Sequence, residues 1–408
     1  MTNPTPLVLD GNEVKLRLQA ERTHTRSAVH VDWLRFTVNL RFAPIPTVDH
    51  LFPKAARDEF DLRSEHQQSE DDRRREKLCH LLRDIPDADF AASTQALEVA
   101  NNVCEILGDG FTVDPEIKKG HDFYRHRWSI LRAGVECGWV GFLASGESPR
   151  QRAQSKTIHC NLYGVACTFA KPGWTAPMAD YVDDHRGLIT RCDLALDFFD
   201  GISGGMDRIA TDYDNGCMDH LGHRPEHNMV GAWRPGGVGR SFYFGSKAAG
   251  KQTNVYDKGV QLYGKQDATG WQRIELRYGN QKRLLVTDML RRPADFFAGA
   301  SLWHAQMVEE HGSVAVPEPV KTEPRLPLET LLAECTRNAR WGFSTAGKTL
   351  ALMVRYMDLE TLGSFVENCA ELPGRLSKFE RSEVERVYQQ MFKKMFKGSS
   401  AGHAAHAF

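Results

Sequence analysis

The run WQRIELRY at residues 271–278 decides the fold, because polar and apolar residues alternate along it. Alternate residues of a strand lie on the same face of a sheet, so Arg273, Glu275 and Arg277 are expected to share one face. The run TNVYDKG at residues 253–259 has a similar pattern, with Tyr256 at its centre. These residues predict a sheet with one polar and one apolar face.

Other strand-like runs lie on both sides of this pair. Strands are predicted at residues 29–40, 124–134, 138–145, 157–170, 188–199, 240–246 and 253–262, and helices at 54–107, 174–186 and 205–214. Runs of strands joined by short turns, with helices grouped together, are typical of α+β proteins. The expected fold is α+β, with a largely antiparallel central sheet, flanking helices and a C-terminal helical region.

Composition divides the chain into five parts. They are a flexible N-terminal segment 1–27, an α+β domain 28–310 with a charged helical insertion at about 54–110, a proline-rich linker 311–327, a helical region 328–397 and a flexible tail 398–408. A chain of 408 residues is long enough for two or three domains with cores of their own.

Charge and cysteine usage exclude several classes of protein. The net charge of −1 excludes a globally basic DNA-coating protein, so any nucleic-acid surface must be local. The nine cysteines include no Cys-x-x-Cys pair, which argues against a disulfide framework and a thiolate zinc site. With no apolar run of membrane-spanning length and no signal peptide, the expected location is a bacterial cytoplasm, without a membrane partner.

Tyr256 differs from the other strand tyrosines, because polar or charged residues flank it on its own face. A phenol has a pKa of about 10 and needs a nearby cation or base to act as a nucleophile. Lys258, Arg273 and Arg277 could supply that field or neutralise phosphate oxygens. We therefore predict that Tyr256 attacks a phosphate, whereas the ordinary role of a strand tyrosine is cross-strand packing.

Three acids accompany the tyrosine. Asp193 and Asp197 lie four residues apart, about 13 Å along a strand, so Asp193 pairs better with Glu275 of another strand. Hard oxygen ligands suit Mg²⁺ or Mn²⁺, which would polarise a phosphoryl oxygen. The alternative for these acids is an Arg191–Asp193 or Arg277–Glu275 salt bridge across the sheet.

Cations outnumber acids between residues 234 and 292. The predicted DNA contacts in this segment are Arg240, Lys247, Lys251, Lys282 and Arg283, and the alternative is a solvated basic face. The run GGVGR at 236–240 lacks the Lys-Ser/Thr ending of a P-loop, and no Gly-x-Ser-x-Gly is present. An ATPase, a dinucleotide site and a serine hydrolase are therefore not expected.

Eight motifs in the same order along the chain resemble the replication initiation factor family. They are VDWLRF (31–36), HCNLYGVAC (159–167), RCDLALDF (191–198), RSFYFGS (240–246), NVYDKG (254–259), WQRIELRY (271–278), NARWGFSTAGKTLALMVR (338–355) and LPGRL (372–376). This family comprises rolling-circle initiators of filamentous phages and small plasmids, with relatives among the relaxases of integrative elements.

The resemblance implies a DNA nickase and strand transferase. Tyr256 would attack a phosphodiester at an origin, remain bound to the 5′ phosphate and leave a free 3′-OH for a polymerase. Asp193, Asp197 and Glu275 would bind Mg²⁺ or Mn²⁺. Lys258, Arg273 and Arg277 would hold the scissile phosphate and stabilise the charge of the transition state.

The function expected from the sequence is metal-dependent initiation of rolling-circle replication, for a filamentous phage. The alternatives are a relaxase of an integrative or plasmid element with the same chemistry, and an origin-binding protein that does not cut. The expected partners are origin DNA, double-stranded or extruded as a single strand, a host helicase and polymerase, and a second copy of the chain in a homodimer.

Overall fold

The computed structural model describes most of the chain in two compact units. Described are residues 10–45, 67, 69–70, 73–74, 77, 88–148, 151, 154–219, 222–234, 237–322, 327–368, 371–374, 376–377 and 379–397. The first unit ends at Thr322 and the second begins at Glu323, so the boundary lies within the predicted linker 311–327. The two units are considered separately.

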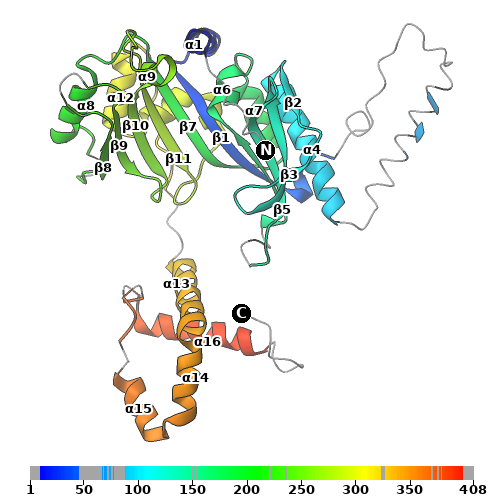
Figure 1. Cartoon of the computed structure of the whole chain (residues 1–408), viewed down its shortest axis with the longest axis vertical. Coiled ribbons are helices and arrows are strands. Elements are labelled where there is room, and N and C mark those ends of the chain that lie inside the picture. The colour runs from blue at the N-terminus through cyan, green and yellow to red at the C-terminus, as the bar shows by residue number, and fades with distance from the viewer. Residues whose placement is uncertain are drawn as a thin grey trace. The chain divides into compact units, whose positions relative to one another are not determined.

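The first unit is built on one large sheet (Figure 1). The described strands run in the order β2-β4-β5-β6-β1-β7-β11-β10-β9-β8, with β3 paired to β4, and every named pair is antiparallel. Their bounds are β1 Val29–Asn39, β2 Phe111–Val113, β3 Lys118–Lys119, β4 Tyr124–Arg132, β5 Val135–Ala144, β6 Thr157–Leu162, β7 Leu188–Phe198, β8 His227–Val230, β9 Ser241–Ser246, β10 Lys251–Asp257 and β11 Gln272–Gly279. The predicted α+β class with a largely antiparallel sheet is confirmed.

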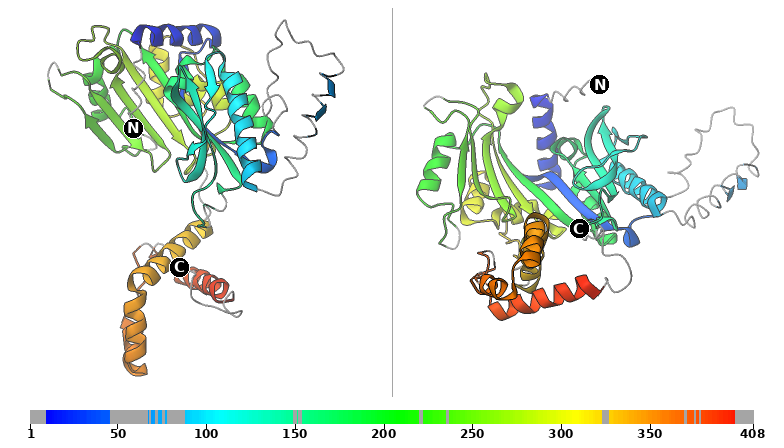
Figure 2. Two further views of the ribbon diagram at one scale, coloured as in Figure 1. Left: turned by 45° about the vertical axis from the view of Figure 1, so that its right-hand side comes forward. Right: turned by 60° about the horizontal axis from the view of Figure 1, so that its bottom comes forward.

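One face of the sheet is apolar and carries the core. Leu34, Leu194 and Ile274 on neighbouring strands are completely buried there. Helices pack around the twisted sheet, as Figures 1 and 2 show. They are α1 Gly11–Thr25, η1 Leu40–Phe42, α4 Ala88–Leu107, α6 Gly164–Phe169, α7 Thr175–Asp184, α8 Gly205–Asp214, α9 Lys258–Tyr263, α10 Asp288–Arg291, α11 Pro293–Ala298 and α12 Leu302–Glu310.

The N-terminal segment differs from its prediction, because residues 11–25 form helix α1 instead of a flexible arm. Asp10 caps the helix, and its carboxylate accepts a hydrogen bond from the amide of Asn12 at 2.8 Å. Near the other end, the Glu21 carboxylate accepts the amide of Gly173 at 2.8 Å. The cap and the contact with Gly173 stabilise a helix whose sequence is mostly polar. Residues 1–9 of the predicted segment lie outside the described residues.

Two predicted strands end early because a helix follows each. β6 ends at Leu162 and α6 begins at Gly164, and β10 ends at Asp257 before α9 begins at Lys258. Short apolar runs fit a strand or a buried helix equally well, so periodicity alone could not place these boundaries. Of the predicted helices at 54–107, α4 is described, whereas most of residues 54–87 lie outside the described residues.

The second unit is helical over its described residues. Its elements are α13 Pro327–Trp341, η2 Gly342–Ala346, α14 Gly347–Tyr356, α15 Leu359–Asn368 and α16 Arg381–Lys397. A small separate core joins α13 and α16, formed by Leu331, Cys335, Leu376, Val384 and Val387. The predicted tail 398–408 lies outside the described residues. No helix in the described part of the chain is long and apolar enough to span a membrane.

Candidate active site on the polar sheet face

Strands β7 and β11 bring the predicted polar residues together on one face. The register places Arg273 opposite Asp197, Glu275 opposite Ala195, and Arg277 opposite Asp193. On the far side of β11, Tyr256 of β10 lies opposite Arg273. The residues that sequence alternation assigned to a common face therefore do lie side by side.

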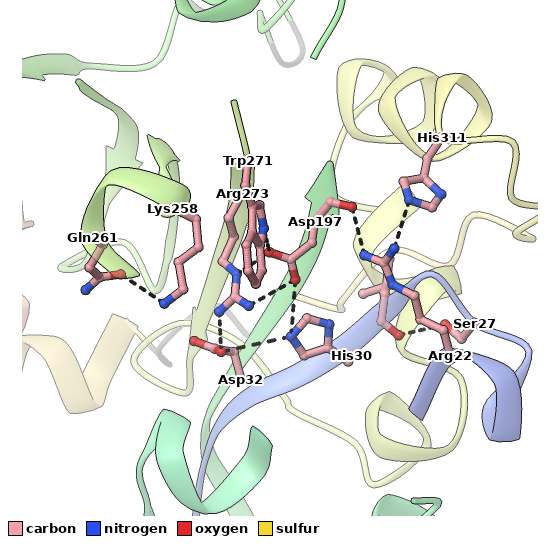
Figure 3. A network of polar contacts seen from close by, with 11 residues as sticks. Arg22, Ser27, His30, Asp32, Asp197, Lys258, Gln261, Trp271, Arg273 and His311 are labelled. Carbon is pink, nitrogen blue, oxygen red and sulfur yellow. Dashed lines mark hydrogen bonds and ion pairs between the residues drawn. The ribbon is translucent and has the colours of Figure 1, made fainter. Parts of the chain in front are cut away.

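Arg273 and Asp197 form the buried centre of this face (Figure 3). The Arg273 guanidinium donates to both Asp197 oxygens, at 2.7 and 3.0 Å, and the Trp271 indole nitrogen donates to the same carboxylate at 2.6 Å. Burial alone would raise the pKa of Asp197, but the charge of Arg273 outweighs it and holds that pKa below its usual range. The pair is an ionised, fully bonded unit.

A third acid, Asp32, binds the same guanidinium. Arg273 Nη1 donates to Asp32 Oδ1 at 2.6 Å. The register of β1 against β7 shifts between Val31 and Trp33, so Asp32 occupies a β-bulge. Bulges redirect side chains and are frequent beside active sites. This one allows Asp32 to reach the polar face, two strands away from Arg273.

Asp193 is held by two arginines. Arg191 binds it closely through Nε and Nη2, and Arg277 Nε approaches Asp193 Oδ2 to 3.3 Å. The Asp193 side chain is completely buried. The salt bridge between Arg191 and Asp193 that the sequence offered as an alternative is therefore present.

Glu275 is the acid with the weakest compensation. Its nearest cationic partner is Arg277, whose Nη2 lies 3.8 Å from the carboxylate. Burial raises the pKa of Glu275 to about 7, and the negative charges of Asp32 and Asp193 add to that rise. Glu275 is thus a carboxylate with excess negative charge around it, which a bound cation would relieve.

The three acids predicted as metal ligands do not form a common ligand set. No group of three His, Cys, Asp or Glu side chains in the described ranges is placed to hold an ion. Arginines already occupy the oxygens of Asp193 and Asp197. Mg²⁺, however, is commonly bound by one or two carboxylates together with substrate phosphates. Glu275 fits that pattern, so the donor set supports one protein carboxylate at the ion.

Tyr256 lines a pocket of about 480 Å³ that also contains Glu275 and Arg277. The phenol is half-buried, and its desolvation raises the pKa of Tyr256 well above the usual value, although Arg273 opposes the rise. Lys258 Nζ lies 5.8 Å from the centre of the Tyr256 ring and donates to Gln261 at 2.9 Å. Burial, together with the charge of Arg273, lowers the pKa of Lys258 to about 8. Lys258 beside this phenol and Glu275 in the same pocket thus both have shifted pKa values. Clusters of shifted pKa values are common at functional sites.

One comparison with known proteins, against protein-family models, agrees with the resemblance seen in the sequence. Residues 187–362 match the family model described as replication initiation factor. Over these residues the family resemblance is confirmed. Among solved structures, the rolling circle replication initiator protein from Geobacillus stearothermophilus matches with 16% identity, a TM-score of 0.40, and coverage of 73% of this chain and 88% of that one. That degree of likeness transfers no residue role. Comparison with curated proteins finds no match.

The replication initiation factor match contains Tyr256 and the predicted acids, but three residues of the network precede it. Asp32 and His30 come from β1 and Arg22 from α1. Arg22 donates to the Asp197 carbonyl at 2.8 Å, and His30 Nε2 lies 3.7 Å from Asp197 Oδ2. Desolvation lowers the pKa of His30 to about 4. The alternation of His30 and Asp32 in HVDWLRF was the available signal, but the bulge that makes it meaningful could not be seen in sequence.

The predicted DNA-contacting cations divide into two groups. Arg240 and Lys247 line the pocket of Tyr256, and Lys282 is exposed. Lys251 instead lies on the same face of β10 as the buried Thr253 and Val255. Its ammonium donates to the Ala300 carbonyl at 2.9 Å. Arg283 likewise donates closely to the Ala249 carbonyl. These two cations are bound to the main chain, so they are weaker candidates for DNA contacts than Lys247 and Lys282.

Proposed function

We propose that this chain is a tyrosine nickase and strand transferase that initiates rolling-circle replication. The observation that carries the proposal is that Tyr256 lines a polar pocket together with Glu275 and lies close to Lys258, inside the segment that matches replication initiation factors. A strand tyrosine that served only packing would face the apolar core, as the neighbouring Val255 does.

In the proposed reaction, the Tyr256 hydroxyl attacks the scissile phosphorus and the bond to the 3′ oxygen breaks. The phenolic proton passes to the free amine of Lys258, whose lowered pKa leaves part of it unprotonated near neutral pH. The resulting ammonium, with Arg277 at the pocket wall, balances the phosphate charge. The departing 3′ oxygen takes up a proton from solvent, so the products are a 5′-phosphotyrosine and a 3′-OH. The reverse attack by a 3′-OH rejoins the strand.

Arg273 has a different role from the one its sequence position suggested. Its guanidinium is buried and satisfied by Asp197 and Asp32, so it is not free to bind a phosphate. We assign it to positioning, because it ties β11, the strand that carries Glu275, to β7 and β1. Glu275 and a DNA phosphate oxygen would hold Mg²⁺ or Mn²⁺, and the ion would act as a Lewis acid on the phosphoryl group.

A supercoiled plasmid carrying the DNA that surrounds the gene for this chain provides the test. With Mg²⁺ or Mn²⁺ the parent protein should relax the plasmid and leave a peptide containing Tyr256 on a 5′ end, detected by mass spectrometry. Tyr256→Phe should bind but form no adduct, whereas Tyr243→Phe, in the same pocket, should form it normally. An adduct on another tyrosine would refute the assignment.

The role of Lys258 has its own control. The rate of nicking by the parent should rise with pH through about 8, because the amine form of Lys258 increases there. Lys258→Arg keeps a cation but removes the base, so it should be slow and lose that pH dependence. If Lys258→Arg nicks like the parent, Lys258 acts through its charge alone.

A DNA-binding protein that does not cut remains the competing function. It predicts no covalent adduct in any variant and full origin binding by Tyr256→Phe. A relaxase of a mobile element shares the proposed chemistry. Four further expectations from the sequence remain predictions: replication on behalf of a filamentous phage, a host helicase and polymerase as partners, a homodimer, and a location in the bacterial cytoplasm.

A further inference from the structure

Three polar side chains in the pocket of Tyr256 have no side-chain hydrogen-bond partner among the described residues. Tyr243, Gln252 and Asn254 line the pocket, and none makes a side-chain hydrogen bond with the described residues. The Asn254 amide oxygen is buried and unbonded. Buried polar groups are nearly always hydrogen-bonded, so this amide is available to bind a polar group that enters the pocket.

The strand register sets these groups side by side. Asn254 lies opposite Tyr243 on β9 and opposite Glu275 on β11, while Gln252 lies opposite Arg277. Along β10, Asn254 is roughly 7 Å from Tyr256 and Gln252 roughly 13 Å, from about 3.3 Å per residue. A base attached to a phosphate at Tyr256 would therefore reach Asn254 and Tyr243.

The side chains of Tyr243, Gln252 and Asn254 suit a nucleobase better than another phosphate. Asn and Gln amides present a donor and an acceptor together, the pattern that pairs with the edge of a base, most often adenine. The Tyr243 ring is half-exposed and has no aromatic or cationic partner among the described residues, so it is available for stacking. Inside a duplex the faces of a base are covered by its stacked neighbours, so a base that stacks on Tyr243 must be unstacked and unpaired.

We propose that Tyr243, Gln252 and Asn254 form a subsite for one unpaired base of the cleaved strand, with a preference for adenine. This inference rests on the proposed function, because the nucleophile fixes where the phosphate lies. Tyr243 stacks on the base, and the two amides read its edge. The pocket volume of about 480 Å³ is within the range of small-molecule sites.

The test measures equilibrium binding, so that it does not depend on cleavage. Fluorescently labelled single-stranded homo-oligonucleotides of dA, dC, dG and dT are titrated with the full chain at fixed salt, and anisotropy gives each Kd. The parent should bind the dA oligonucleotide about 10-fold or more tightly than the weakest of the four. Gln252→Ala and Asn254→Ala should remove that preference and leave the weakest binding unchanged.

Two matched controls separate base reading from charge. Lys282→Ala removes an exposed cation and should weaken all four oligonucleotides equally, because phosphate contacts carry no sequence information. Tyr243→Phe should retain stacking, whereas Tyr243→Ala should lose it for every base. Thermal unfolding of each variant verifies that it is folded.

The outcomes distinguish this subsite from the proposed function. A parent that binds all four oligonucleotides equally, or an unchanged preference in both amide variants, would overturn the subsite. If the preference disappears in those variants while Tyr256→Phe still nicks, the subsite stands and the nucleophile is wrong. If Tyr256→Phe fails to nick but base preference survives in the amide variants, the nickase stands alone.

Discussion

At the scale of single residues, the site depends on how each acid is compensated. Asp197 and Asp32 share the Arg273 guanidinium, Asp193 is bound by Arg191, and Glu275 has only a distant arginine. The arginines that bind the first three acids also occupy the carboxylate oxygens that a metal would need. Glu275 is left as the group that responds to a cation or a proton.

Asp197→Ala should destabilise the first unit by about 3–5 kcal/mol, because it leaves the buried Arg273 charge without its main partner. Urea unfolding at neutral pH measures the loss. Asp207→Ala is the control, since Asp207 is exposed and its ion pair with Arg240 is worth little. A loss below about 1 kcal/mol in Asp197→Ala would mean that Arg273 finds other partners.

Glu275 predicts an unusual pH dependence of stability. Its pKa is about 7 in the folded chain against 4.5 for the free side chain, so folding favours the protonated form. That contribution is full below about pH 4.5 and is lost as pH rises through 7. The parent should therefore lose stability between pH 5.5 and 8 more steeply than Glu275→Gln, by on the order of 2 kcal/mol. Parallel pH curves for the two proteins in urea would contradict the shift.

Divalent ions provide a second measurement on the same residue. Mg²⁺ or Mn²⁺ should raise the unfolding temperature of the parent at pH 8, because binding to the folded state stabilises it. Glu275→Gln should lose that response. Asp193→Asn should retain it, since arginines already occupy that carboxylate. Equal loss in both variants would restore Asp193 to the ligand set.

At the scale of elements, the turn from β10 into α9 places Lys258 beside Tyr256. The Gly259 amide donates to the Trp271 carbonyl at 2.9 Å, which ties the start of α9 to β11. A β-carbon at Gly259 would overlap the Asp267 carboxylate. That carboxylate is held in turn by the amide and hydroxyl of Thr269. The glycine in the YDKG motif is therefore a packing requirement.

Gly259→Ala should destabilise the turn by about 1–3 kcal/mol, because the new methyl group must displace a fixed side chain. Hydrogen exchange at β10 and α9 should quicken. Gly342→Ala in the second unit is the control, since nothing lies within 4 Å of its β-carbon. Unchanged exchange around Lys258 in Gly259→Ala would show that the Asp267 loop adjusts freely.

At the scale of the whole molecule, the chain has two cores. The sheet core of the first unit and the small cluster of Leu331, Cys335 and Leu376 share no buried residue. The boundary between the two units lies after Thr322. Units with separate cores can unfold independently.

Calorimetry of the full chain should accordingly show two transitions. Leu331→Ala removes a buried side chain from the second core and should lower one transition, at a cost of about 2–5 kcal/mol. Leu276→Ala, in the sheet, should lower only the other. A single transition that shifts in both variants would mean that the two units unfold together.

The amino-acid sequence by itself determined the periodic part of this protein. Alternation assigned Arg273 and Glu275 to one face of the strand WQRIELRY, since the period of a strand is fixed by backbone geometry. It likewise assigned Asp193 and Asp197 to one face of the strand RCDLALDF. The same reasoning predicted the antiparallel α+β class. The sequence also favoured Tyr256 as the nucleophile. The polar residues that flank it along the strand can be identified without knowing which residues the folded chain brings close to it.

Only the tertiary structure decided which partners those side chains meet. The bulge at Asp32, the approach of Arg22 from α1 and the pairing of Asp193 with Arg191 and Arg277 depend on strand order and register. The helix at residues 11–25 is likewise fixed by contacts to residues more than a hundred positions away. Local patterns encode which way a side chain points, but burial and the distance between charges are properties of the folded chain, and together they set the pKa shifts in this site.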